Sequence, residues 1–157
     1  MTSTYSIRRA AAGDAALLGH MVGKLMRELY PDDLDYADDA MLVAAAERLL
    51  RGEQRYVAFI AVDDRGTPAG AMALNECAAV YAWGLFGEIS ELYVEPAHRS
   101  AGLGKLFIDR AKAFAAERSW TMLEVGAADG PRWQKSIDFY LRCGFEEIGP
   151  RLYLMIG

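Results

Sequence analysis

The sequence predicts a mixed α/β fold in which helices cover both faces of a central, mostly antiparallel sheet. Two kinds of pattern support this fold class. Short β-branched and aromatic runs indicate strands, and apolar residues spaced three or four positions apart indicate amphipathic helices. The patterns follow one another in the order strand, helix, helix, three strands, helix, strand, helix, strand.

Residues that end or begin each element fix its expected limits. Pro31 and Gly52 end the first two helices, and the turn before Pro68 separates two antiparallel strands. The expected elements are a strand at 5–9, helices at 15–30 and through 42–50, strands at 56–62, 69–74 and 86–94, a helix from 103, a strand at 120–125, a helix at 136–143, and one or two strands within 145–156.

Length and composition indicate one globular domain over residues 1–157. The chain has 157 residues, of which 53% are hydrophobic, and no linker or repeat divides it. A chain of this length buries roughly 70% of its unfolded surface. We therefore expect a single domain with a sizeable core.

Net charge and hydropathy limit the classes of binding partner that we expect. The formal net charge of −5 argues against nucleic-acid binding and favours cationic small molecules. No window resembles a membrane span or a signal peptide, so a cytoplasmic protein without membrane contact is expected. Cys77 and Cys143 lack metal-ligand spacing, and no metal site is predicted.

A glycine-containing loop, Arg99-Ser-Ala-Gly102-Leu-Gly104, joins the strand that ends at Val94 to the helix that begins at Leu103. The first N–H groups of a helix have no acceptor within the helix, and the helix dipole adds positive charge there. Glycine lets a phosphate approach the main chain because it has no Cβ. The loop therefore predicts a phosphate site, although it matches neither the Walker nor the dinucleotide-binding pattern.

Two motifs carry a family resemblance. Arg99-x-x-Gly102-x-Gly104 resembles the acyl-CoA loop of the GNAT superfamily (Gcn5-related N-acetyltransferases), and Tyr140-x-x-x-Gly144-Phe resembles the end of its C-terminal helix. The resemblance implies a GNAT fold, acetyl-CoA as cofactor and acetyl transfer to an amine. Trp133 and Gln134 depart from the family, which often has asparagine or a similar residue there.

The resemblance also implies which residues contact the cofactor. Loop amides would hold the pyrophosphate, the Leu92 amide the thioester oxygen, and the Val94 amide the pantetheine arm. Arg99 could either contact phosphate or cap the strand end. The expected acetyl-CoA residues are Leu92, Tyr93, Val94, Arg99, Ser100, Ala101, Gly102, Leu103, Gly104, Lys105, Ser136 and Tyr140.

Transfer to an alkyl amine needs a base, because only about one molecule in 2,500 is free base at pH 7. Glu88 and Glu91 are the candidates, and on an ideal strand they would face opposite sides unless a bulge intervenes. The alternative is that Glu88 and Glu91 are solvated strand residues without a catalytic role. Tyr140 resembles the family's general acid for the leaving thiolate, and a core tyrosine is its alternative.

The acceptor is predicted only by class. Six acidic residues lie between Glu28 and Asp39 and could attract a polyamine, an aminoglycoside or a lysine-like amine, or could simply be a solvated linker. A small-molecule amine is the favoured substrate. Rival hypotheses are a protein lysine or N-terminal acetyltransferase and a CoA-binding sensor without turnover. The apolar segment 152–156 makes a homodimer possible.

Overall fold

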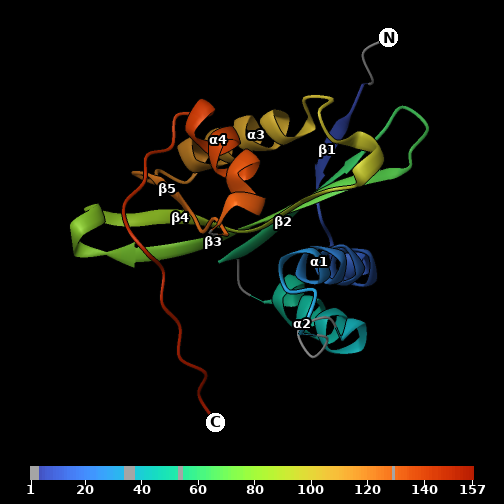
Figure 1. The fold of residues 1–157 in the computed structure, drawn as a ribbon, viewed down its shortest axis with the longest axis horizontal. Coiled ribbons are helices and arrows are strands. Elements are labelled where there is room, and N and C mark those ends of the chain that lie inside the picture. The colour runs from blue at the N-terminus through green and yellow to red at the C-terminus, as the bar shows by residue number, and fades with distance from the viewer. Residues whose placement is uncertain (1–3, 34–37, 53–54, 129) are drawn as a thin grey trace. The chain divides into compact units, whose positions relative to one another are not determined.

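The computed structural model describes residues 4–33, 38–52, 55–128 and 130–157. These residues form two units, 1–125 and 126–157, and each unit is described by itself. Within the described residues, the first unit holds a five-stranded sheet with three α-helices, and the second holds one (Figure 1). The single domain over 1–157 stays a prediction.

The sheet of the first unit has the strand order β1-β2-β3-β4-β5. Neighbouring strands are antiparallel except for β4 and β5, which are parallel, so the predicted mostly antiparallel sheet is confirmed. The elements are β1 (Ser6–Arg9), α1 (Ala15–Leu29), α2 (Asp39–Arg51), β2 (Tyr56–Val62), β3 (Pro68–Ala79), β4 (Gly84–Val94), α3 (Leu103–Glu117), β5 (Leu123–Val125) and, in the second unit, α4 (Gln134–Arg142).

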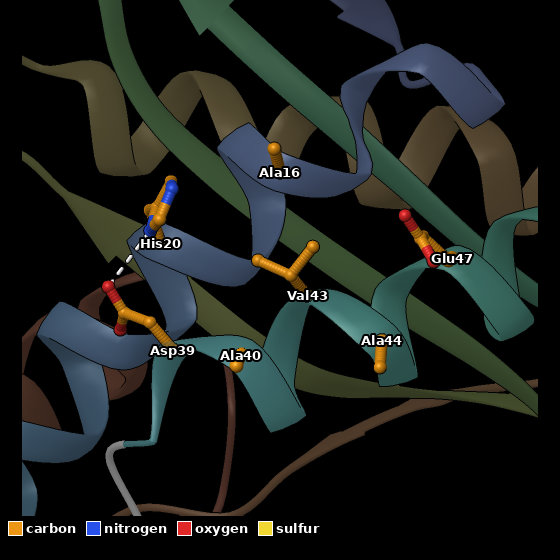
Figure 2. A pocket seen from close by; sticks show the side chains of 7 residues that line it. All are labelled: Ala16, His20, Asp39, Ala40, Val43, Ala44 and Glu47. Carbon is orange, nitrogen blue, oxygen red and sulfur yellow. Dashed lines mark hydrogen bonds and ion pairs between the residues drawn. The ribbon is translucent and has the colours of Figure 1, made fainter.

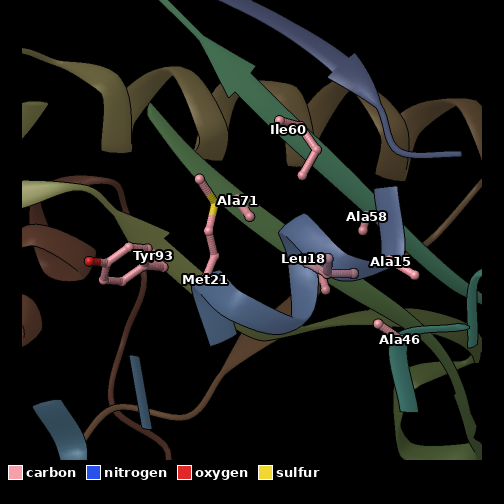
Figure 3. Packing of buried hydrophobic residues seen from close by; sticks show 9 residues of the cluster. Ala15, Leu18, Met21, Ala46, Ala58, Ile60, Ala71 and Tyr93 are labelled. Atoms are coloured by element: carbon pink, nitrogen blue, oxygen red, sulfur yellow. The ribbon is translucent and has the colours of Figure 1, made fainter. Parts of the chain in front are cut away.

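Helices cover both faces of this sheet, as Figure 1 shows for α1 and α2 on one side and α3 on the other. Alternate residues of β2 explain the two layers, because successive strand side chains point to opposite faces. Ala58 and Ile60 join the cluster beneath α1 in Figure 3, which includes Leu18. Phe59 points the other way and meets the ring of Phe114 from α3 at 5.7 Å.

Glycines allow α1 and α2 to approach closely. A Cβ on Gly19 would lie 2.7 Å from the backbone of Val43, and one on Gly23 would collide with the Asp39 carboxylate. Real Cβ atoms do not approach backbone that closely, so α2 can pack at this distance only because position 19 lacks a side chain. The pair of helices forms the roof over one face of the sheet.

A β-bulge interrupts β4 at Ser90. Ile89 pairs with Leu74 of β3 and Glu91 pairs with Ala73, so two adjacent residues of β3 face three of β4. Ser90 is the extra residue, and such an insertion shifts the alternation of the side chains that follow it. The phase of β4 therefore changes between its first and second halves.

Three expected strand segments differ from the structure. The strand expected at 120–125 is confined to Leu123–Val125. The strand expected at 69–74 continues to Ala79, because it pairs with the first residues of β4 in a long hairpin. The strands expected within 145–156 are wrong, because the structure describes this segment without a strand. Its apolar run 152–156 is exposed and does not alternate, so it specifies no buried face and no register.

The glycine loop and the helix after it agree with expectation, and α3 begins at Leu103 as predicted.

Among the helices in the described part of the chain, none is long and apolar enough to cross a membrane.

Replacing Gly19 with alanine should destabilise the first unit by about 1–3 kcal/mol, because the added methyl group overpacks the α1–α2 contact. Urea unfolding followed by circular dichroism measures the loss. Gly13→Ala is the matched control, since a Cβ at Gly13 would meet nothing within 4 Å. Equal stabilities of the two variants would contradict the close-approach argument.

Candidate active site

The bulge at Ser90 brings the two candidate bases to one face of the sheet. Glu88 pairs with Asn75 and Glu91 pairs with Ala73, and these two β3 residues are two positions apart. Residues two apart on a strand face the same side, and paired residues share that side. Glu88 and Glu91 therefore lie together on the face covered by α1 and α2.

Glu91 projects into a narrow cavity of about 50 Å³ between α1, α2 and the sheet. Its Oε2 atom accepts hydrogen bonds from the Tyr56 hydroxyl at 3.1 Å and from Ser90 Oγ at 2.8 Å. Apart from Tyr56 and Glu91, the lining is aliphatic or glycine: Leu18, Gly19, Val22, Leu42, Ala45, Ala46 and Leu49. The carboxyl group thus lies in an apolar chamber with two hydroxyl donors.

Burial raises the pKa of Glu91 above the usual value of a glutamate, because the apolar chamber disfavours its charge. Hydrogen bonds from Ser90 and Tyr56 lower this pKa, and repulsion from Glu88 raises it, so the net direction is upward. Burial and the Glu91 carboxylate raise the pKa of Tyr56, so its hydroxyl keeps its proton and donates. This is an environment suited to a general base.

A polar row crosses the same face of the sheet. Strand pairing aligns Tyr56 of β2, Asn75 of β3, Glu88 of β4 and Glu124 of β5. Tyr81 donates a hydrogen bond from its hydroxyl to Glu124 at 3.0 Å. Carboxylates from two strands therefore lie side by side on the face that carries Glu91.

Sequence reasoning missed Tyr56, Ser90 and Glu124. Each belongs to the site only through strand register, which no local pattern specifies. Tyr56 alone gave a signal, as a tyrosine that begins an otherwise apolar strand. No group of three or more His, Cys, Asp or Glu side chains able to hold a metal ion occurs among the residues that the structure covers.

The second half of β4 offers backbone N–H groups at its outer edge. β5 pairs with β4 only as far as Ile89, directly before the bulge. The Glu95 N–H, directly after β4, donates to the carbonyl of Ala69 in β3, and N–H groups alternate along an antiparallel strand. Leu92 and Val94 therefore direct their N–H groups away from β3, toward the edge that β5 leaves open.

The loop after β4 positions the N-terminus of α3. Ser100 and Gly102 both have left-handed backbone conformations, with φ of 62° and 84°. Gly102 is the residue before the helix, and its carbonyl accepts from the Leu106 N–H at 3.2 Å. The N–H groups of Leu103 and the next residues have no acceptor within the helix, so they are directed outward.

Arg99 is held at the end of β4. Its Nε donates to the Val94 carbonyl at 2.9 Å, and its guanidinium forms an ion pair with Glu28 of α1 at 2.6 Å. The guanidinium also lies 5.6 Å from the centre of the Tyr93 ring. Of the two roles that the sequence left open for Arg99, these contacts match the strand-end cap.

In the second unit, Tyr140 and Gly144 form a helix cap. Gly144 has a φ of 97°, its N–H bonds the Leu141 carbonyl at 3.0 Å, and the Phe145 N–H bonds the Tyr140 carbonyl at 3.1 Å. This is a Schellman motif, and the Tyr140 and Phe145 rings pack at 5.6 Å as such motifs favour. The cap uses the carbonyl and ring of Tyr140 and leaves its hydroxyl for another role.

Burial raises the pKa of Tyr140 to about 12, so its hydroxyl keeps its proton at neutral pH. Ser136 lies one turn earlier on α4 and is half-buried. The two residues predicted from the C-terminal motif thus share one helix of the second unit.

Much of the acidic region between Glu28 and Asp39 has structural partners. Glu28 pairs with Arg99, Asp38 caps α2 by accepting from the Met41 N–H, and Asp39 pairs with His20 and Arg27. Asp35 and Tyr36 lie outside the described residues. These contacts favour the linker interpretation over a cluster that attracts substrate, although Glu28, Asp38 and Asp39 have protein partners and are not only solvated.

A larger hollow of about 500 Å³ lies between α1 and α2 (Figure 2), and its walls are Ala16, His20, Asp39, Ala40, Val43, Ala44 and Glu47. Its His20 and Asp39 side chains bond each other at 2.9 Å. None of its lining residues comes from β4 or the glycine loop. We therefore centre the candidate site on the narrower cavity of Glu91.

A family model described as Acetyltransferase (GNAT) domain matches residues 54–147, which include β4, the glycine loop and α4. The chain belongs to the GNAT acetyltransferases. As a GNAT protein it is an acyltransferase, and the predicted family and enzyme class are confirmed.

Solved structures share this GNAT fold over nearly the whole chain. An aminoglycoside acetyltransferase from an uncultured soil metagenomic sample has a TM-score of 0.80 at 21% identity, covering 98% of this chain and 99% of that one. A ribosomal-protein-alanine N-acetyltransferase from Brucella melitensis has 0.76 at 22%, covering 98% and 99%. An aminoglycoside N-acetyltransferase in complex with CoA has 0.73 at 18%, covering 99% and 97%. At these identities the likeness establishes the fold.

Changing Glu91 to glutamine in this GNAT domain should raise the melting temperature more at pH 8 than at pH 4. The unfolded chain ionises Glu91 at its usual pKa, but the folded chain resists ionisation because the pKa is raised. The unmodified protein therefore loses folding stability as pH rises from the usual to the raised pKa, whereas glutamine does not titrate.

Thermal unfolding at a series of pH values measures this difference. Glu47→Gln is the matched control, because Glu47 is exposed on α2 and lies outside the cavity that holds Glu91. A constant or falling advantage of Glu91→Gln with pH would show that the buried carboxyl carries no ionisation cost.

Proposed function

We propose that this GNAT enzyme transfers the acetyl group of acetyl-CoA to a primary amine of a small molecule, directly within a ternary complex. The observation that carries the proposal is Glu91, a carboxylate in an aliphatic cavity beside the open strand edge of Leu92 and Val94. A base next to backbone donors is what acyl transfer to an ammonium substrate requires.

The glycine loop fits the pyrophosphate of CoA. A Cβ on Gly102 would meet nothing within 4 Å, so space is open directly over the loop backbone. We assign the pyrophosphate to the N–H groups of residues 100–105, from Ser100 through Ala101 to Lys105. Bound acetyl-CoA would supply an acetyl group already activated as a thioester.

Backbone donors on β4 would orient the acyl group. We assign the Leu92 N–H to the thioester oxygen, where it stabilises the negative charge that develops during transfer, and the Val94 N–H to the pantetheine arm. Tyr93, between them, has a buried side chain, so its contribution would come from the backbone. On α4, Ser136 is assigned to cofactor contact.

Glu91 would remove the proton from the substrate ammonium, with Glu88 beside it on the same face. Because the Glu91 pKa is raised, this carboxylate is a stronger base than a solvated glutamate. The Tyr140 hydroxyl, which keeps its proton at neutral pH, would give that proton to the departing thiolate. In this proposal Glu91 accepts one proton and Tyr140 donates one.

Charge favours a cationic acceptor. Glu88 and Glu124 lie on the same face as Glu91 and would attract an ammonium group. Two of the compared structures are aminoglycoside acetyltransferases by name, which supports a small-molecule amine. The similarity to a ribosomal-protein-alanine acetyltransferase favours a protein N-terminus as the second candidate.

Thiol release from acetyl-CoA should occur with one class of amine. The panel contains polyamines, aminoglycosides, amino acids, lysine peptides and peptides with an N-terminal alanine. Glu91→Gln and Tyr140→Phe should each lower kcat/KM by about 10²-fold, because each removes one proton-transfer group. Tyr140→Phe keeps the carbonyl and ring of the helix cap. CoA binding without any turnover would instead favour a sensor.

Gly102→Ala should weaken CoA binding by about tenfold or more, since the methyl group stands where the phosphate approaches. Gly66→Ala is a matched control, because Gly66 also has positive φ, at 80°, and open space around its Cβ. Both variants should lose about 1–2 kcal/mol of stability from left-handed strain. Calorimetric titration with CoA separates them, and equal affinities would remove the loop from the cofactor site.

A further inference from the structure

Only one of the two oxygens of the Glu91 carboxylate accepts hydrogen bonds from the protein. Tyr56 and Ser90 both donate to Oε2. Within the described residues, Oε1 has no hydrogen-bond partner. Every fully buried side-chain oxygen among these residues does have a partner. Oε1 is therefore not completely buried.

The two hydroxyl donors come from different strands. Tyr56 reaches Glu91 from β2, across β3, and Ser90 is the extra residue of the bulge. Ser90 Oγ also lies 3.4 Å from the Ala73 carbonyl, so the bulge itself fixes the serine side chain. Because the donors approach the carboxylate from separate elements, together they define its orientation.

Few titratable groups surround this carboxylate. Tyr56 faces it from β2 and Glu88 from its own strand. On β3, the paired residue is Ala73, and α1 and α2 contribute aliphatic side chains and Gly19 to the cavity. The charge state of Glu91 therefore depends on burial, on the two hydroxyls and on Glu88.

We propose that Tyr56 and Ser90 are positioning residues, whose hydroxyls hold Oε2 of Glu91 so that Oε1 faces the acceptor amine and takes its proton. This inference rests on the proposed acetyl transfer. In the proton step, the N–H bond of the ammonium breaks, its electron pair stays on nitrogen, and an O–H bond forms at Oε1. The freed electron pair then attacks the thioester carbon, the carbon–sulfur bond breaks, and the thiolate leaves and takes up the proton that we assign to the Tyr140 hydroxyl.

Hydroxyl donors serve this purpose better than cations would. Tyr56 remains neutral and can only donate to a carboxylate, so it favours the ionised base without the strong stabilisation that an arginine would give. Burial acts in the opposite direction and keeps the base strong. Loss of either hydroxyl should therefore raise the Glu91 pKa further and misdirect Oε1.

Tyr56→Phe tests the inference through the pH dependence of kcat/KM. The acidic limb should move to higher pH because the Glu91 pKa rises, so that kcat/KM falls about tenfold on this limb. On the plateau kcat/KM should stay below that of the unmodified protein, because Oε1 is misdirected. Ser90→Ala should shift the limb in the same direction. Tyr5→Phe is the matched control, because it removes a hydroxyl bond of similar length, 3.0 Å to His98, outside the site.

A second measurement is independent of turnover. Carbon-13 NMR of labelled glutamate carboxyls follows the titration of Glu91, whose signal is assigned by its loss in Glu91→Gln. The midpoint should rise in Tyr56→Phe and Ser90→Ala and stay unchanged in Tyr5→Phe. A matching shift of the NMR midpoint and the kinetic limb supports the inference.

Three results would overturn it. An unchanged midpoint would mean that the hydroxyls do not control Glu91. A shifted midpoint with an unmoved kinetic limb would mean that Glu91 is not the base. Absence of turnover in the unmodified protein, with the midpoint shift intact, would reject the proposed function and with it the catalytic use of this carboxylate.

Discussion

One extra residue in β4 determines how the candidate site is assembled. Without the bulge at Ser90, regular alternation would place Glu88 and Glu91 on opposite faces of the sheet. The bulge also stands directly after Ile89, where β5 stops pairing with β4. A single irregularity therefore gathers the carboxylates on one face and leaves backbone donors open at the strand edge.

Features that depend on neighbouring residues were predictable from the sequence. The start of α3 follows from glycines and apolar spacing, and Gly144 caps α4 because left-handed backbone suits glycine. Register was not predictable, since it is a relation between distant strands. Tyr56 and Ser90 are therefore not predictable as site residues from any local pattern, and the strands expected within 145–156 are wrong because nothing in that segment specifies a partner.

Stability and chemistry oppose each other around Glu91. The helices that roof the chamber pack tightly through Gly19, and their aliphatic side chains exclude water from a group that favours it. Two hydroxyls offset part of that cost. A leucine or methionine at position 91 would suit the aliphatic chamber better, and a carboxylate there agrees with the role as a base that we propose for Glu91.

The ion pair between Arg99 and Glu28 connects the loop before α3 with helix α1. An anion that drew the guanidinium away would cost this contact, and a cation that bound Glu28 would release Arg99. Thermodynamic linkage makes the two effects equal in size. An anion bound at Arg99 and a cation bound at Glu28 would then be coupled by one free energy, so that each would favour the binding of the other.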